Sequence, residues 1–214
     1  MGEETLLIVG NGFDLSMGFK TSYGDFMKSS FFPKYDSTLC SHLRKQFQEN
    51  MGWIDIEKEL SEFSSMLISM KQDAKKKHIK WEYDSFREEY EELKSSLKAY
   101  LQEETKRAFG PSPDNPAKRV IDQLPAESKI ISFNYTSIIE RMTRDRFCVS
   151  KGNLLHIHGS LAPYDDIVFG VEDSAKLSKE HVFLYKVHSQ SLKAREFSCW
   201  LNSVERIIFY GYSL

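Results

Sequence analysis

Leu6-Leu7-Ile8-Val9-Gly10-Asn11-Gly12-Phe13-Asp14 is an apolar run that ends abruptly in two glycines and a carboxylate. A continuous apolar run is typical of a fully buried parallel strand, and the glycines after it predict a tight turn. In α/β domains such a turn brings backbone N–H groups close to a phosphate. The stretch therefore predicts an α/β domain with a nucleotide-type pocket near its start.

The composition sets limits on size, partners and compartment. With 214 residues, 41% of them apolar, the chain can bury one substantial core, so we predict a single α/β domain over residues 1–214. A formal net charge of −2 gives no broad attraction to nucleic-acid phosphates, and we expect no DNA or RNA partner. The three cysteines lie far apart without a Cys-x-x-Cys pair, which favours a reducing compartment; they are Cys40, Cys148 and Cys199.

The N-terminal segment enters the first strand without a signal-peptide pattern. No window of the sequence approaches the length and apolarity of a membrane-spanning helix. We therefore expect a cytoplasmic protein that does not use a membrane as partner.

The middle of the chain is predicted to be helical. Apolar residues recur every three or four positions in two series, Ile56 to Met70 and Phe86 to Tyr100. We predict two long amphipathic helices that form an antiparallel hairpin joined near His78, inside a helical insertion of about residues 36–109. Gly110-Pro111-Ser112-Pro113 then predicts a linker.

The acids that precede and begin the first long helix have a structural explanation. Asp55 and Glu57 stand where negative side chains complement a helix dipole. A role toward a substrate stays open for both residues.

Short β-type runs follow the linker. The predicted strands are Lys129–Phe133, Leu154–Ile157, Ile167–Phe169 and Arg206–Tyr210, with a helix between Ser189 and Asn202. Strands that alternate with helices predict a mostly parallel, Rossmann-like sheet. The classical dinucleotide fingerprint is absent, because Leu15 stands where that fingerprint has a glycine.

Three later strands end as the first one does, in small or polar residues. These endings are Asn134-Tyr135-Thr136, His158-Gly159-Ser160 and Gly211-Tyr212-Ser213. Ligands of open α/β sheets bind outside the carboxyl ends of the strands. We therefore predict that the four endings meet at one crevice.

Two residue types at these endings suit acid–base chemistry on a sugar. The amide of Asn134 both donates and accepts hydrogen bonds, and an imidazole near its ordinary pKa acts as a base at neutral pH. Of the two histidines we prefer His158, because it adjoins Gly159 at the strand end while His156 lies deeper in the apolar run. For Asp14 three roles remain open: it holds a ribose, orients Thr21 or caps the following turn.

The ordered set of motifs resembles the AbiH family of bacterial phage-abortive-infection proteins. The motifs are Gly10-Asn11-Gly12-Phe13-Asp14 with Gly18 and Thr21-Ser22-Tyr23, then Trp53-Ile54-Asp55-Ile56-Glu57, Phe133-Asn134-Tyr135-Thr136, His156-Ile157-His158-Gly159 and Gly211-Tyr212-Ser213. The resemblance implies a role in bacterial defence against phage. Members of the family continue beyond the last motif, so we expect that the C-terminal part of the family domain is missing after Leu214. An exposed last strand would then allow a homo-oligomer.

The same strand endings resemble, more distantly, the sirtuin-type NAD-binding fold. This resemblance implies that Gly10 and Gly12 approach the pyrophosphate, that Asn134 holds the nicotinamide ribose and that His158 is the base. Gly211 and Ser213 would face the adenosine side. The sirtuin zinc cysteines are missing and Thr136 replaces an aspartate, so protein deacylation is disfavoured. We predict NAD as substrate or ligand and no metal; the catalytic residues are Asn134 and His158, and the binding residues are Gly10, Asn11, Gly12, Asp14, Thr21, Thr136, Gly159, Gly211 and Ser213.

Three hypotheses for the function follow. The first is an NAD glycohydrolase, since cleavage of the nicotinamide–ribose bond needs a base and a polar group that orients the sugar. The second is a non-catalytic sensor that binds NAD or ADP-ribose. The third is a metal-dependent hydrolase, for which a strict metal spacing is lacking; its ligands would be His156, His158, Asp14 and Asp165 or Asp166.

Overall fold

The computed structural model describes residues 4–34, 37–108, 110–144 and 152–212. The chain divides into two compact units. The first contains the described residues up to Ser22, those from Leu101 to Val168 and those from Ser191 onward. The second contains residues 23–100 and 169–190. Residues 169–190 therefore belong to the same unit as most of the helical insertion that the sequence predicts at about residues 36–109. Cys148 and Ser213 lie outside the described residues.

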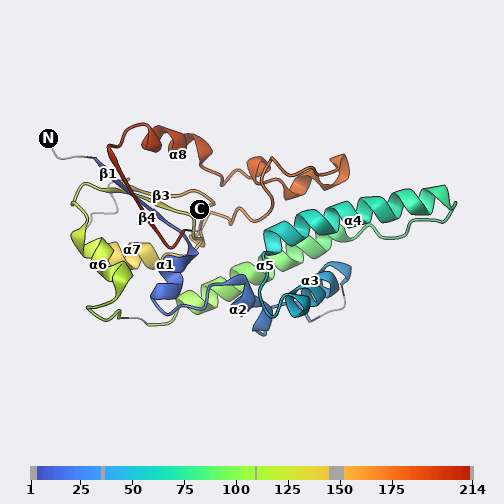
Figure 1. Ribbon diagram of the computed structural model, residues 1–214, viewed down its shortest axis with the longest axis horizontal. Helices are drawn as coiled ribbons and strands as arrows, with labels where there is room; N and C mark the ends of the chain where they lie inside the picture. Colours follow the sequence, from blue (N-terminus) through green and yellow to red (C-terminus); the bar gives the residue numbers. More distant parts are fainter. Residues whose placement is uncertain (1–3, 35–36, 109, 145–151, 213–214) are drawn as a thin grey trace. The chain divides into compact units, whose positions relative to one another are not determined.

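A parallel sheet forms the centre of the first unit (Figure 1). Its strand order is β3-β2-β1-β4, and every neighbouring pair is parallel. The strands are β1 (Thr5–Val9), β2 (Lys129–Ser132), β3 (Leu154–His156) and β4 (Arg206–Tyr210). This finding confirms the predicted Rossmann-like α/β fold. The chain adds β2 and β3 on one side of β1 and then crosses to the other side for β4, so the topological switch point lies between β1 and β4.

Helices cover both faces of this sheet. One face, which includes Leu7 and Val9, packs against residues of α1 (Asn11–Ser16), α6 (Pro116–Gln123) and α7 (Ile138–Thr143). The opposite face, which includes Leu6 and Ile8, packs against α8 (Ala194–Leu201). All five residues of β1 are buried because both of its faces are covered, which explains the unbroken apolar run in the sequence.

One predicted strand is wrong. Ile167–Phe169 is buried but belongs to no strand, and Val168 N donates to His158 O at 2.7 Å as an isolated bond. Gly159, the residue after His158, has a φ of +69°, and a Cβ added there would overlap Asp166 O. The turn therefore brings the apolar segment back against the end of β3 without a regular ladder. Its burial, rather than strand pairing, accounts for its composition.

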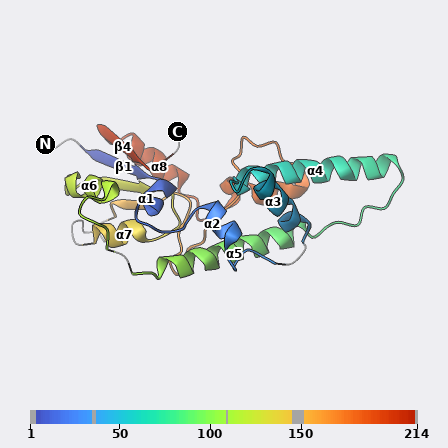
Figure 2. The ribbon, with the colours of Figure 1, turned by 60° about the horizontal axis from the view of Figure 1, so that its bottom comes forward.

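The second unit is mainly helical (Figure 2). Its elements are α2 (Tyr23–Lys28), α3 (Thr38–Glu49), α4 (Ile56–Lys76), most of α5 (Phe86–Thr105) and two 3₁₀ helices, η2 (Lys179–Leu184) and η3 (Lys186–His188). Figures 1 and 2 show α4 and α5 running in opposite directions, as expected for a helical hairpin. The rings of Phe63 and Phe86 meet edge to face between them, with centroids 5.0 Å apart. None of the helices that the structure describes is long and apolar enough to cross a membrane.

The acids near the start of α4 have partners within the second unit. Asp55 is the N-cap residue, and its Oδ1 accepts a hydrogen bond from Lys58 N at 3.2 Å. Glu57 Oε2 accepts from the buried Lys186 Nζ at 2.8 Å, and Glu172 accepts from the same ammonium at 2.8 Å. Both acids therefore have structural roles, since one caps a helix and the other pairs a buried cation.

The loops after β1 and β4 are in direct backbone contact. Gly10 N donates to Tyr210 O at 3.1 Å, and Gly12 N donates to Gly211 O at 2.9 Å. A Cβ added to Gly12 would lie 2.6 Å from the Cα atom of Gly211. Glycine at position 12 is thus required by the approach of two backbones at the switch point.

We expect Gly12→Ala to lower the free energy of unfolding by about 1–3 kcal/mol, because a methyl group at this position overlaps backbone atoms that cannot move aside. Gly110→Ala is the matched control, since an added Cβ there has no atom within 4 Å, and it should change stability by less than about 0.5 kcal/mol. Urea unfolding followed by circular dichroism measures both. Equal stabilities for the two variants would contradict the close contact between the backbones of Gly12 and Gly211.

Candidate functional site

Polar atoms at the carboxyl edge of the sheet connect the strand endings. Asn134 Nδ2 donates to Gly10 O at 3.1 Å and so joins the loop after β2 to the loop after β1. His156 Nδ1 lies 2.8 Å from Asn134 O and joins the end of β3 to the same loop. With the contact between Gly12 and Gly211, these bonds bring the four endings to one edge of the first unit.

Asp14 is the most deeply buried charged group of this region. It belongs to α1, is 1% exposed and accepts hydrogen bonds from Asn134 Nδ2 at 2.8 Å and from the Thr136 hydroxyl at 2.5 Å. Burial raises the pKa of Asp14 to about 7, although the two hydrogen bonds and the nearby His156 oppose the rise. The carboxyl group therefore changes its protonation state near neutral pH. The carboxyl group of Asp14 therefore binds the loop after β2. It does not orient Thr21, whose hydroxyl donates to Asn11 instead.

The amide of Asn134 is oriented by its surroundings. Nδ2 faces the carboxylate of Asp14 and the carbonyl of Gly10, and both are acceptors, so this end of the amide must be the nitrogen. In the part of the chain that the structure describes, Oδ1 has no hydrogen-bond partner. Asn134, the predicted sugar-binding residue, thus offers Oδ1 as an acceptor, and the two hydrogen bonds from Nδ2 fix the position of this oxygen.

His156 supports this loop. Its Nδ1 faces Asn134 O, and its Nε2 lies 2.7 Å from Glu140 Oε1 on α7. Both neighbours are acceptors, so the doubly protonated ring satisfies both. Burial lowers the pKa of His156, but the hydrogen bond and charge of Glu140 outweigh it and raise the pKa above its ordinary value. These contacts give His156 a structural role; His158, and not His156, is the histidine that the sequence predicts as the base.

Sequence reasoning did not identify Glu140. An acid in the first turn of a short helix is common for dipole reasons alone, and its pairing with His156 depends on how α7 packs on the sheet.

His158 points to a different layer of the first unit from Asn134. The imidazole is half-buried and meets the ring of Phe133 edge to face at 5.2 Å. Phe133 contacts Phe197 of α8 at 5.9 Å and Tyr212 at 4.8 Å. The imidazole of His158 therefore lies toward the α8 layer, whereas the amide of Asn134 lies toward α1. Both side chains belong to the carboxyl edge, and a ligand that touches both must lie across it.

Asn11 and Thr21 form a reciprocal pair. Thr21 Oγ1 donates to Asn11 Oδ1 at 2.7 Å, and Asn11 Nδ2 donates to Thr21 O at 3.3 Å. Asn11 is exposed at the start of α1 while Thr21 is buried. The pair fixes the segment after α1 beside the glycine turn.

The ligands considered for a metal-dependent hydrolase have separate partners. Asp14 contacts Asn134 and Thr136, His156 contacts Glu140, and Asp165 Oδ2 accepts from Ser160 Oγ at 2.9 Å. Within the described ranges, no group of three or more His, Cys, Asp or Glu residues is placed to hold a metal ion.

Comparison with known proteins gives one result for nearly the whole chain. The family model described as "Bacteriophage abortive infection AbiH" matches residues 6–214. No curated protein matches the chain.

The raised pKa of Asp14 predicts how stability depends on pH. The folded state keeps a proton on this group up to about pH 7, whereas the unfolded chain loses it near the ordinary pKa of 3.8 for an aspartate. Between these values the folded state binds more protons, so the contribution of Asp14 to stability falls as pH rises. Relative to Asp14→Asn, the wild type should lose roughly 3 kcal/mol between pH 4 and pH 7. Urea unfolding at several pH values measures this difference.

Asp165→Asn is the control for this experiment. Hydrogen bonds from Ser160 and Ser191 and the charge of Lys193 outweigh partial burial and lower the pKa of Asp165. Its stabilising contribution is therefore nearly complete at pH 4 and complete by about pH 5, so the difference from wild type should change by less than about 0.5 kcal/mol from pH 4 to pH 7. Parallel curves for wild type and Asp14→Asn would contradict the assignment to Asp14.

Proposed function

The chain belongs to the AbiH family of bacteriophage abortive infection proteins, and from this premise we propose that it binds NAD or a related nucleotide and hydrolyses the N-glycosidic bond between nicotinamide and ribose. Family membership implies the setting, which is defence against phage infection. The proposal adds the ligand and the reaction. We assign both to the carboxyl edge of the sheet in the first unit.

The observation that carries the proposal is the meeting of four strand-end loops beside a topological switch point. In sheets of this order, ligands bind outside the carboxyl ends of the strands where the connections diverge, here between β1 and β4. The loops on both sides of that point contain glycines whose backbones touch, Gly12 and Gly211. These glycines let the two loops approach each other closely at the edge where a ligand of such a sheet binds.

Asn134 is proposed to hold the ribose. Its Nδ2 is used by Asp14 and Gly10, so the remaining Oδ1 would accept a hydrogen bond from a ribose hydroxyl. The two bonds at Nδ2 restrict rotation of the amide before the ligand arrives, which lowers the entropy lost on binding. Asp14 and Thr136 then act through Asn134 as positioning residues.

His158 is proposed to act as the base. It would take a proton from a water molecule whose oxygen attacks the anomeric carbon of the ribose, while the carbon–nitrogen bond breaks and its electron pair leaves with nicotinamide. The products are nicotinamide and ADP-ribose, and the proton on His158 returns to solvent. Phe133 lies beside the imidazole and Tyr212 lies beside Phe133, and these two rings provide aromatic surface against which a planar ring can pack.

The remaining predicted residues would border the same ligand. We assign the pyrophosphate to the turn of Gly10 and Gly12, with Asn11 and Thr21 beside it, and the adenosine side to Gly211 with Ser213. Gly159 would allow the end of β3 to turn close to the ligand. We place the reaction in the cytoplasm, where reducing conditions suit the free thiols of Cys40 and Cys199.

Release of nicotinamide from NAD by the purified chain tests the proposal. We expect release by the wild type and a rate lower by about 10²- to 10⁴-fold in His158→Ala, the range associated with loss of a general base. Asn134→Ala should lower the rate similarly. Chromatographic measurement of nicotinamide gives the rates, and circular dichroism confirms that each variant is folded.

His188→Ala is the matched control, because this histidine is exposed and belongs to the second unit. It should leave nicotinamide release unchanged. Saturable binding of NAD or ADP-ribose without any release would contradict hydrolysis and support a sensor. A protein that neither binds nor cleaves these nucleotides would overturn the proposal.

A further inference from the structure

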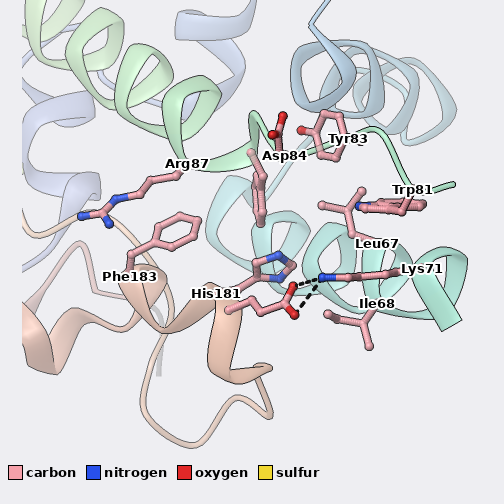
Figure 3. Close-up of a pocket in the computed structure, with 11 residues that line it drawn as sticks. Leu67, Ile68, Lys71, Trp81, Tyr83, Asp84, Arg87, His181 and Phe183 are labelled. Carbon is pink, nitrogen blue, oxygen red and sulfur yellow. Dashed lines mark hydrogen bonds and ion pairs between the residues drawn. The ribbon is translucent and has the colours of Figure 1, made fainter. Parts of the chain in front are cut away.

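The second unit contains a pocket of about 240 Å³ that shares no residue with the candidate site. Side chains from α4, from the stretch between α4 and α5, from the start of α5 and from η2 line it (Figure 3). All of these segments belong to the same compact unit. An inference from this pocket therefore does not rest on the proposed NAD chemistry.

The walls of the pocket are largely aromatic. Trp81 and Tyr83 lie before α5 with ring centroids 6.4 Å apart, and Phe86 and Phe183 meet at 5.5 Å. Leu67 and Ile68 of α4 add aliphatic surface (Figure 3). Aromatic faces and edges favour a planar ring as ligand, because stacked and edge-to-face pairs add to the energy of burial.

One polar group is directed into this apolar surface. His181 is 8% exposed, and the Ser64 hydroxyl lies 2.7 Å from its Nδ1. In the described part of the chain, Nε2 has no hydrogen-bond partner. Burial lowers the pKa of His181, so its ring is neutral at physiological pH. A ligand in the pocket therefore meets an oriented, uncharged ring nitrogen at that point.

The charges around the pocket balance one another. Lys71 Nζ and Glu180 form a two-oxygen ion pair with distances of 2.7 and 2.8 Å. Arg87 lies over the ring of Phe183 at 5.7 Å, and Asp84 supplies a further negative charge. Two positive and two negative groups favour neither an anion nor a cation. The pocket thus suits an uncharged ring.

We propose that this pocket binds a neutral, planar heteroaromatic ring system of nucleobase size, packed against Trp81 and hydrogen-bonded to Nε2 of His181. The volume supports this size, because it is below the range of about 300–1,000 Å³ that is typical for drug-sized ligands. A purely hydrocarbon ring would leave the histidine nitrogen unpaired, which costs free energy. A heteroaromatic ring can both pack against the aromatic walls and form a hydrogen bond with Nε2 of His181.

Calorimetric titration with adenine, adenosine, guanosine, cytidine and uridine tests the proposal. Free adenine and adenosine distinguish a site for the base alone from one that accepts the attached sugar. At least one of these probes should bind saturably. Trp81→Ala should weaken that binding about tenfold or more, as expected for the loss of base–aromatic stacking. His181→Phe keeps a ring while removing both nitrogens and should weaken binding as well.

Trp53→Ala is the matched control, since Trp53 is 67% exposed and does not line the pocket. Binding of the same probe should be unchanged in this variant and in Asn134→Ala, which alters only the candidate site of the first unit. The absence of saturable binding for all five probes at millimolar concentration would overturn the proposal. Binding that Trp81→Ala and His181→Phe leave unchanged, or that Asn134→Ala abolishes, would overturn it too.

Discussion

The carboxyl edge of the sheet depends on a buried carboxylate that accepts hydrogen bonds from a neighbouring loop. Asp14 follows β1, and its partners Asn134 and Thr136 follow β2. Removing this group from water is unfavourable, so its partners must stay in place to compensate. Through Asn134 O, the same loop is tied to His156 and from there to Glu140 on α7. A single polar network thus joins α1, the loop after β2, β3 and α7 of the first unit.

This network also determines which atoms remain for a ligand. The amide nitrogen of Asn134 is used internally, and its oxygen is not. The ring of His158 packs with Phe133 on the side of α8. The two groups that the sequence suggests for catalysis therefore approach from different layers. A dinucleotide lying across the sheet edge is the arrangement that would use both.

The second unit is assembled from two separate stretches of chain. The helical segment contains the apolar series of α4 and α5, and residues 169–190 complete its core. Two contacts join the stretches: Tyr90 Oη donates to Phe169 O, and Lys186 pairs with Glu57. The aromatic pocket exists only because η2 brings His181 and Phe183 to the side chains of α4 and α5. Neither stretch contains that pocket alone.

Local pattern determined much of this protein. The apolar run of β1, the three- and four-residue spacing of α4 and α5 and the glycine endings predicted an α/β fold and the set of strand-end loops, because these features depend on backbone geometry and burial of neighbouring residues. The sequence pattern did not identify α6 and α7. It also predicted a strand at Ile167–Phe169, where the structure has a buried segment without strand pairing. It also did not show that Thr21 pairs with Asn11, that Glu140 pairs with His156 or that His158 and Asn134 face different layers. These features required the tertiary structure, since each depends on a contact between residues distant in sequence whose orientation is set by packing.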